Sequence, residues 1–272
     1  MSRRRMLRPV VRTLTTAALF GSVGSFGVAA AVASPAGQAG VNKLISVRGD
    51  TADSLNWAGY AVTPGSGITA VTGTFTVPSV SVLPPGFSAS WAGIGGYTTS
   101  DLIQAGVSEN SSIGGELLGG QYNAWYEILP ASETPISGCT GDSSCTVSAG
   151  DKVSVDISNS GGDNWNISLT DAGKWSWSTS VTYASSESSA EWIQEAPSLE
   201  GVQTIPAGVG TVAFGPTSSF TEGGTNETIA EGNPTLIDES PLTEVNEATP
   251  SPLASDGQSF NVCVYAQSCA AP

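Results

Sequence analysis

Apolar and polar residues alternate with a period of two along much of this chain, and this alternation is the feature that most limits its fold. Residues 151 to 158 read Asp-Lys-Val-Ser-Val-Asp-Ile-Ser, and the same pattern returns in residues 164 to 170 and 174 to 183. The turn-forming stretches 160 to 163 and 171 to 174 separate these runs. The pattern predicts antiparallel hairpins whose strands have one buried and one solvated face.

No segment after the N-terminal region shows a sustained 3.6-residue period, and the chain holds 33 glycines and 16 prolines. Frequent turns between short strands predict an all-β, antiparallel two-sheet β-sandwich of jelly-roll or concanavalin-like type, with a barrel as the alternative. The acidic, proline-containing stretch 221 to 257 is expected outside the main sheets. Further strand-like runs are residues 71–77, 89–94, 102–107, 124–129, 190–194, 209–214 and 260–265.

The N-terminal residues have the pattern of an export signal. Five arginines precede an apolar run, and Ala31 and Ala33 offer a small-residue cleavage site, so residues 1–33 are predicted to be a signal peptide of a secreted protein. Residues 2 to 7 also resemble a twin-arginine motif, although an ordinary signal with an arginine-rich start fits equally well. Residues 34–53 are expected to be a flexible lead or short propeptide, and residues 54–272 to form one domain with no membrane span.

The charge distribution restricts the partners of the exported chain. Five of the nine basic residues lie in the first 33 residues and all 24 acidic residues follow them, which leaves the cations Lys43, Arg48, Lys152 and Lys174. Nucleic acids and anionic membranes bind through clustered lysine and arginine, so neither is an expected partner. With so few cations, hardly any carboxylate can depend on a salt bridge that protonation would break. The composition therefore suits an acidic environment.

The chain contains no histidine. This absence excludes Ser-His-Asp and Cys-His catalytic sites and histidine-bound metal, and leaves carboxylate and amide chemistry. The four cysteines form two close pairs, Cys139 with Cys145 and Cys263 with Cys269. In an exported protein we expect two local disulfides, because the spacing lacks the CxxC knuckles of a four-cysteine zinc site.

Five short motifs follow one another along residues 54 to 267. Together, in this order and spacing, they resemble the glutamic peptidases, the eqolisin or G1 family, with the features of a bacterial-type member. The motifs are Asn-Trp-Ala-Gly-Tyr (56–60), Trp-Ala-Gly-Ile-Gly-Gly (91–96), Leu-Ile-Gln-Ala-Gly-Val (102–107), Gln-Tyr-Asn-Ala-Trp-Tyr-Glu (121–127) and Ser-Ala-Glu-Trp-Ile (189–193).

The resemblance implies two large antiparallel sheets with an active site on the concave face of one. By motif, Gln104 and Glu191 match the catalytic pair, and Trp91, Trp125 and Glu127 match residues that line the same groove. It further implies hydrolysis of protein or peptide substrates in acid without metal or cofactor, and we expect a monomer. In the expected chemistry the Glu191 carboxylate takes a proton from water, and the Gln104 amide stabilises the developing oxyanion.

The chain departs from the fungal members of the family at three positions. It has Gly95, Ser108 and Asn123 where those members tend to carry acids. Fewer carboxylates around the site should leave the pKa of Glu191 less perturbed than in those members and shift the pH optimum or specificity.

Two other functions fit parts of the pattern. A retaining glycoside hydrolase would use Glu127 and Glu191 with carboxyl groups about 5–5.5 Å apart. A carbohydrate-binding β-sandwich would present exposed tryptophans, although the alternation around Trp165 and in residues 174 to 183 indicates core-facing side chains. A serine-lysine dyad is disfavoured, because the two candidate lysines at 152 and 174 lie at or beside turns.

Overall fold

The computed structural model describes residues 43–65, 67–113, 116–240 and 246–272. Within these ranges the chain forms β-strands and a single 3₁₀ helix, Ile229–Gly232. None of the described segments is a helix with the length and apolarity needed to cross a membrane. The predicted signal peptide, residues 1–33, and the following residues 34–42 lie outside the described residues.

The strands form two layers, and we call the first the inner-site sheet because it carries the candidate site. Its neighbouring strands run in the order β7, β6, β5, β12, β3, β18, β2 and β1. All neighbours are antiparallel except β18 and β2. The strands are β1 (Leu44–Arg48), β2 (Thr51–Ser54), β3 (Trp57–Val62), β5 (Ala89–Gly95), β6 (Leu102–Ile113), β7 (Glu116–Ile128), β12 (Ala190–Glu195) and β18 (Thr235–Glu239).

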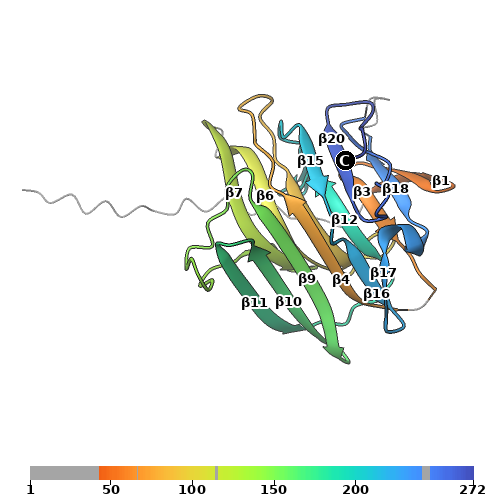
Figure 1. The fold of residues 1–272 in the computed structure, drawn as a ribbon. Helices are drawn as coiled ribbons and strands as arrows, with labels where there is room; N and C mark the ends of the chain where they lie inside the picture. The colour runs from red at the N-terminus through yellow and green to blue at the C-terminus, as the bar shows by residue number, and fades with distance from the viewer. Residues whose placement is uncertain (1–42, 66, 114–115, 241–245) are drawn as a thin grey trace, which may run out of the picture. The chain divides into compact units, whose positions relative to one another are not determined.

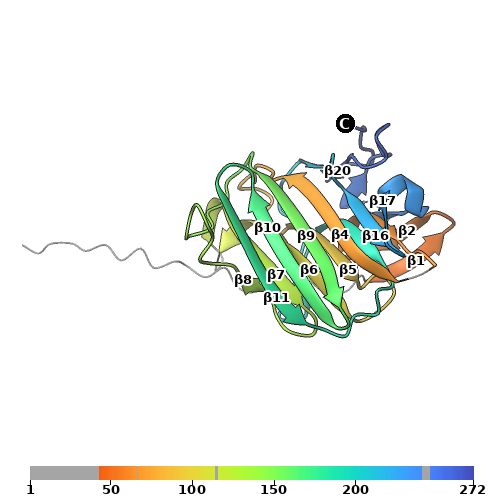
Figure 2. The same cartoon turned by 60° about the horizontal axis from the view of Figure 1, so that its bottom comes forward.

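The second layer, which we call the hydroxyl sheet for its serine- and threonine-rich outer face, contains β11, β10, β9 and β4 side by side. β4 also pairs with β16 and β15, which continue to β17 and β20. Figures 1 and 2 show β9, β10 and β11 lying over β6 and β7 of the inner-site sheet. The strands are β4 (Ile68–Thr76), β9 (Lys152–Gly161), β10 (Asn164–Asp171), β11 (Trp175–Thr182), β15 (Thr211–Phe214), β16 (Ser219–Glu222), β17 (Thr225–Thr228), β19 (Ala248–Pro250) and β20 (Phe260–Val264).

Three short strands complete the pairing. β8 (Thr134–Pro135) adds to β7, and β13 (Ser198–Leu199) pairs with β14 (Val202–Gln203) in a separate hairpin. β19 pairs with β20 and also meets β18 through Glu239 and Ala248, so it joins the two sheets at one end. The predicted all-β antiparallel sandwich is confirmed.

The main core lies between the two sheets. Val153, Val155 and Ile157 of β9 pack there with Trp165, and the serines and charged residues between them face outward. The alternation in β9, β10 and β11 thus gives one buried and one solvated face, as the sequence predicts.

A second apolar cluster covers the other face of the inner-site sheet, and we call it the outer cluster. Because both faces of β3, β5 and β12 are buried, every residue in these strands is buried and the sequence shows no clean alternation there. The outer cluster consists of Ala52, Trp57, Ala61, Ala89, Trp91, Tyr97, Leu102, Trp125, Ile193 and Ile237.

Two sequence-based expectations about organisation were wrong. Residues 44–48 and 51–54 are not part of a flexible lead, since they form the β1–β2 hairpin. Residues 235–239, expected outside the sheets, form β18 between β2 and β3. Both segments gain order from pairing with strands that are distant in the sequence, which a local pattern does not reveal.

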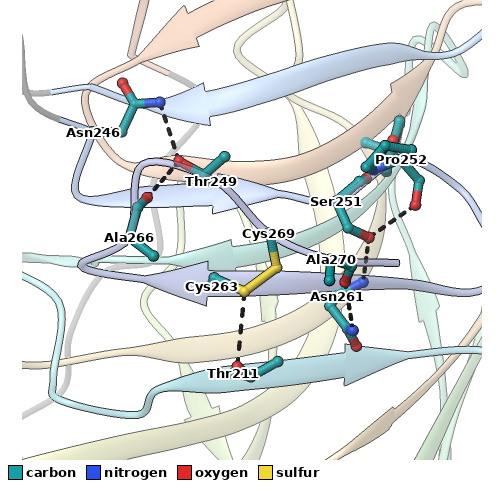
Figure 3. The surroundings of a disulfide bond; sticks show 11 residues. Thr211, Asn246, Thr249, Ser251, Pro252, Asn261, Cys263, Ala266, Cys269 and Ala270 are labelled. Carbon is teal, nitrogen blue, oxygen red and sulfur yellow. Dashed lines mark hydrogen bonds between the residues drawn. A yellow bond between two sulfur atoms is a disulfide. The ribbon is translucent and has the colours of Figure 1, made fainter. Parts of the chain in front are cut away.

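Both predicted disulfides are confirmed, Cys139–Cys145 and Cys263–Cys269. The second bond links β20 to the C-terminal residues, as Figure 3 shows. The Asn261 side chain donates to the Ala270 carbonyl at 2.9 Å and supports the same attachment. The end of the chain is therefore fixed to the second layer.

Candidate active site

The predicted catalytic residues lie in one row across the inner-site sheet. Glu191 of β12 is directly opposite Gly93 of β5, Gly93 is opposite Gln104 of β6, and Gln104 is opposite Glu127 of β7. Directly opposed residues of antiparallel strands point to the same face, which here is the face of the outer cluster. Glu191 and Gln104 are two strand spacings apart, roughly 10 Å between Cα atoms. Gly93 places no side chain between them, so both side chains face one small space.

The strand alternation explains why these side chains point to the site. Ile103, Ala105 and Val107 of β6 enter the main core, so Gln104 points to the opposite face with Leu102. In β7, Trp125 belongs to the outer cluster while Tyr126 packs against the main core. These facings agree with the sequence-based assignment of the two strands.

Glu127 holds the side chain of Gln104. The Gln104 Nε2 group donates to Glu127 Oε2 at 2.7 Å, and both side chains are fully buried. Burial raises the pKa of Glu127 to about 9, with Glu195 adding to the shift and the Gln104 bond opposing it. Glu127 is therefore a neutral acid in acidic solution, and the Gln104 carbonyl oxygen, Oε1, has no partner among the described residues.

Glu191 is buried and has no strong partner. Neither carboxylate oxygen forms a hydrogen bond of ordinary geometry within the described part of the chain. Burial raises the pKa of Glu191 well above its ordinary value, and only the nearby Ser189 hydroxyl opposes that shift. The pKa is strongly perturbed although Gly95, Ser108 and Asn123 contribute no carboxylates, because desolvation is the largest cause of the shift.

The two predicted groove tryptophans lie beside this row in the outer cluster. Trp91 and Trp125 face each other across Gly106, and both are fully buried. Trp91 Nε1 donates to Glu195 Oε2 at 2.9 Å. The indole N–H of Trp125 has no partner among the described residues.

An additional carboxyl group occupies the region where Ser108 and Asn123 replace the acids of fungal members. Ser108 and Asn123 are directly opposed on β6 and β7, and the Ser108 hydroxyl lies 3.4 Å from the Glu133 carboxylate. Burial raises the pKa of Glu133 to about 8, which the Ser108 bond opposes and the charge of Glu195 reinforces. The site therefore contains more carboxyl groups than its motifs indicate.

The sequence analysis missed Glu195, Glu133 and Tyr97. Glu195 lies four residues after Glu191 on the same strand, and this even spacing could have placed it on the same face. Glu133 follows β7 in a turn and Tyr97 follows β5, so neither is part of an alternating run. Only the Gly95-Gly96 pair before Tyr97 indicates a turn with positive φ angles at that point.

The polar atoms without partners are concentrated in this region. They can bind water or a peptide, because buried polar atoms seldom stay unpaired. Among the described residues no group of three or more His, Cys, Asp or Glu side chains has an arrangement suited to a metal. The unpartnered atoms here are Gln104 Oε1, Glu127 Oε1, both Glu191 carboxylate oxygens, and the polar atoms of Tyr97, Trp125 and Ser189.

The geometry disfavours both alternative functions. Glu127 and Glu191 are three strand spacings apart, roughly 14 Å between Cα atoms, with Gln104 between them. A retaining glycosidase needs two carboxyl groups that flank one bond, whereas Glu127 is hydrogen-bonded to the Gln104 side chain, which lies between it and Glu191. All seven tryptophans lie in the described residues. Five are fully buried, Trp175 is nearly so, and Trp177 is partly buried against the core, so none of them offers an exposed platform for sugar rings.

This β-sandwich, with a glutamate and a glutamine in one row of its inner-site sheet, corresponds to the class of all-β peptidases that the sequence motifs indicate. Residues 55–252 match the model of the Peptidase A4 family. The match covers most of the chain, so the chain belongs to that family, and the resemblance to the glutamic peptidases is confirmed, while its bacterial-type character stays a prediction.

One curated relative and two solved structures are similar to this chain, the structures in their fold. The chain is 33% identical over 138 residues to Aspergillopepsin-2 of Aspergillus niger, a match that spans 42% of this chain and 45% of that protein. Scytalido-glutamic peptidase, solved with a transition state analog inhibitor, shares the fold with a TM-score of 0.60 at 21% identity over 77% of this chain and 98% of that one. SCP-B, an eqolisin solved with the tripeptide Ala-Ile-His, has a TM-score of 0.56 at 20% identity and the same coverage.

Proposed function

We propose that this protein is an endopeptidase that hydrolyses proteins in acid, with Glu191 and Gln104 activating one water molecule. The observation that carries the proposal is the row of Glu191, Gly93 and Gln104, in which the two side chains share one face with no side chain between them. The unpartnered carboxylate oxygens of Glu191 and the unpartnered Oε1 of Gln104 support it. Membership of the Peptidase A4 family supports the choice of a peptide bond as substrate.

The chemistry follows from the two groups. The Glu191 carboxylate accepts a proton from the water molecule, whose oxygen attacks the carbonyl carbon of the peptide bond. The carbonyl oxygen gains negative charge, and the Gln104 side-chain amide donates a hydrogen bond to it. The protonated Glu191 then gives its proton to the amide nitrogen, the C–N bond breaks, and Glu191 is a carboxylate again.

The substrate is a protein or peptide, and we place the mature enzyme outside the cell as a monomer without cofactor. The two disulfides support an oxidising location. The four cations against 24 carboxylates support function in acid rather than binding to nucleic acid or membrane.

The test is digestion of denatured haemoglobin or casein from about pH 2 to 7 with pepstatin present. Wild type should hydrolyse the substrate in the acidic part of this range, and Glu191→Gln should abolish hydrolysis. Gln104→Ala removes an oxyanion donor, which typically costs roughly 2.7–4 kcal/mol of barrier, so its rate should fall at least about a hundredfold.

Glu109→Gln provides the matched control. Glu109 is also a fully buried glutamate, but it lies near Ser90 and Gln194 on the main-core side of the sheet. Its substitution should leave hydrolysis near the wild-type rate. Normal hydrolysis by Glu191→Gln would contradict the assignment of Glu191 and Gln104 as the catalytic pair. A loss of hydrolysis in Glu109→Gln as large as that in Glu191→Gln would contradict it as well.

A further inference from the structure

Tyr97 lies on the same face as Glu191, on the side away from Gln104. It belongs to the outer cluster, is only 5% exposed, and its hydroxyl has no hydrogen-bond partner among the described residues. A buried tyrosine hydroxyl normally finds a partner. This unpaired donor, so close to the proposed catalytic pair, therefore requires a functional explanation.

Two glycines direct the chain so that Tyr97 turns back over the sheet. Gly95 and Gly96 have φ angles of +87° and +88°, in the region that favours glycine. A Cβ atom at Gly95 would lie 2.6 Å from the Asp101 carbonyl oxygen. The Gly95 amide donates to the Ser189 carbonyl at 2.9 Å, which ties this turn to the start of β12. The glycine that replaces an acid of the fungal members thus makes room for the turn that positions Tyr97.

The residues that follow Glu191 in its row across the sheet have short side chains, which leaves space for the Tyr97 hydroxyl. Beyond Glu191 the next strands contribute Ala61 of β3 and Thr235 of β18. Ala61 has a small side chain, and Tyr97 packs in the same cluster. Burial raises the pKa of the Tyr97 hydroxyl, the Thr235 hydroxyl lowers it, and the Glu191 carboxylate adds to the rise. Tyr97 therefore remains a protonated donor on the face of the sheet that carries Glu191.

Glu191 has no hydrogen-bond donor of its own among the described residues. One N–H of the Gln104 amide donates to Glu127, the proposed mechanism uses the other N–H for the oxyanion, and the Ser189 hydroxyl forms no bond of ordinary geometry. A buried carboxylate without hydrogen bonds is strongly disfavoured, so the ionised form needed in acid requires support. The other titratable groups that face this region, Asp101, Glu127 and Glu195, are acids and cannot stabilise a negative charge when they are ionised.

We propose that Tyr97 is a positioning residue whose hydroxyl, unpaired in the described structure, donates a hydrogen bond to one oxygen of Glu191 when that carboxyl group is ionised. This bond fixes the carboxylate and leaves its second oxygen to accept the proton of the attacking water. Glu191 is then supported by Tyr97 on one side and meets the water held by Gln104 on the other. The proposal rests on the proposed function.

Tyr97→Phe tests this role by removing the hydroxyl alone. Because a hydrogen bond to a charged group is lost, kcat should fall about tenfold or more with little change in KM. The acidic limb of the pH profile of kcat/KM should move to higher pH by about one unit, since Glu191 loses a group that favours its charged form. The melting temperature measured in acid should not fall, because Glu191 is mostly neutral there and the proposed bond forms only with its ionised carboxylate.

Tyr60→Phe is the matched control. Tyr60 is also 5% exposed, but it lies on the main-core side of the sheet and donates to the Ser251 carbonyl at 2.7 Å. This variant should lose thermal stability and keep the wild-type pH profile. An unchanged kcat and pH profile in Tyr97→Phe, with wild type active and Glu191→Gln inactive, would overturn the role of Tyr97 alone. An active Glu191→Gln would instead overturn the proposed function.

Discussion

Glu191 combines two properties that oppose each other in acid. The mechanism needs its carboxylate, yet burial raises its pKa well above the ordinary value. Hydrogen bonds from water or Tyr97 to the ionised form would lower that pKa again. The hydrogen bonds around this one side chain, rather than its burial alone, are therefore expected to decide at which pH the enzyme functions.

Glu127 offers a direct test of how Gln104 is held. In acid Glu127 is neutral, and its Oε2 accepts from Gln104 Nε2 at 2.7 Å. Glu127→Gln keeps an acceptor oxygen at this place, so its kcat at pH 3 to 5 should remain close to wild type. Glu127→Ala leaves the Gln104 amide unsupported, and kcat should fall by about tenfold, the effect of losing one buried hydrogen bond.

Steady-state kinetics of both variants on one peptide substrate would check this prediction. An equal loss of kcat in Glu127→Gln and Glu127→Ala would show that the ionisable group itself is required. Unchanged kcat in Glu127→Ala would show that Gln104 needs no such support.

At the scale of single residues, the sequence predicted those site members that lie on alternating strands. Gln104, Trp125 and Glu127 point as expected because each neighbouring residue on β6 or β7 enters the main core. Tyr97 and Glu133 could not be predicted in this way, since their directions depend on turns and not on a strand period.

At the scale of elements, the strands with one solvated face were the easiest to predict. β9 and β10 show their period in the sequence because their outer residues are serine, asparagine and aspartate. β12 and β5 are buried on both faces, so their period is hidden. The sequence marked them as the strand-like runs 190–194 and 89–94 but did not show which side chains face the core. β18 was missed because its partners β2 and β3 are far from it in the sequence.

The register of β5 between β12 and β6 predicts that a side chain at Gly93 would crowd the space between Glu191 and Gln104. A Cβ atom at Gly93 would lie 3.0 Å from Gln104 Cβ and 3.0 Å from Trp91 Cζ3. Gly93→Ala should therefore fold with a loss of about 1–3 kcal/mol in the free energy of unfolding. Its methyl group would also enter the space between Glu191 and Gln104, so activity per folded molecule should fall at least about tenfold.

Gly73→Ala is the control for Gly93→Ala, because it crowds the main core without placing an atom in the site. A Cβ atom at Gly73 on β4 would lie 2.8 Å from Ala92 Cβ and 2.9 Å from Trp192 Cδ1, inside the main core. This variant should lose comparable stability but keep its activity per folded molecule. Urea unfolding followed by tryptophan fluorescence, combined with peptide hydrolysis, measures both quantities. Equal activity losses in the two variants would mean that general crowding explains the effect.

At the scale of the whole molecule, buried carboxyl groups outnumber the cations that could pair with them. Among the described residues, the ion pairs are confined to Arg48 and Lys174, whose partners are Asp53, Asp151 and Asp171. Burial raises the pKa of Glu109 to about 8, of Glu127 to about 9 and of Glu133 to about 8. Glu191 and Glu239 are also raised well above their ordinary values, again mainly by burial.

These shifts predict a fold that is most stable in acid. A carboxyl group whose pKa is raised on folding contributes its full stability below the unfolded value of about 4.3. Above that pH the unfolded chain releases a proton that the folded chain retains, so stability falls until the folded pKa is passed. Each such group should reduce the free energy of unfolding by up to about 1.4 kcal/mol per pH unit between about pH 4 and 8. Urea unfolding at intervals from pH 3 to 9 should show this decline.

Glu109→Gln isolates one contribution to this decline without touching the proposed active site. Glu109 is fully buried between the sheets, where Gln194 Nε2 donates to its Oε2 at 3.4 Å and its Oε1 has no partner in the described structure. An uncharged amide of the same shape has no proton to lose, so the variant should lose stability less steeply than wild type from about pH 5 to 8. Exposed acids with lowered pKa values, such as Asp142 and Glu231, act in the opposite sense below about pH 4 but weakly, because solvent screens them. If wild type gained stability up to pH 8, or if the slope of Glu109→Gln matched that of wild type, Glu109 would have to be ionised within the folded protein. In that case the interior between the sheets would tolerate a charge that its burial and its lack of cations argue against.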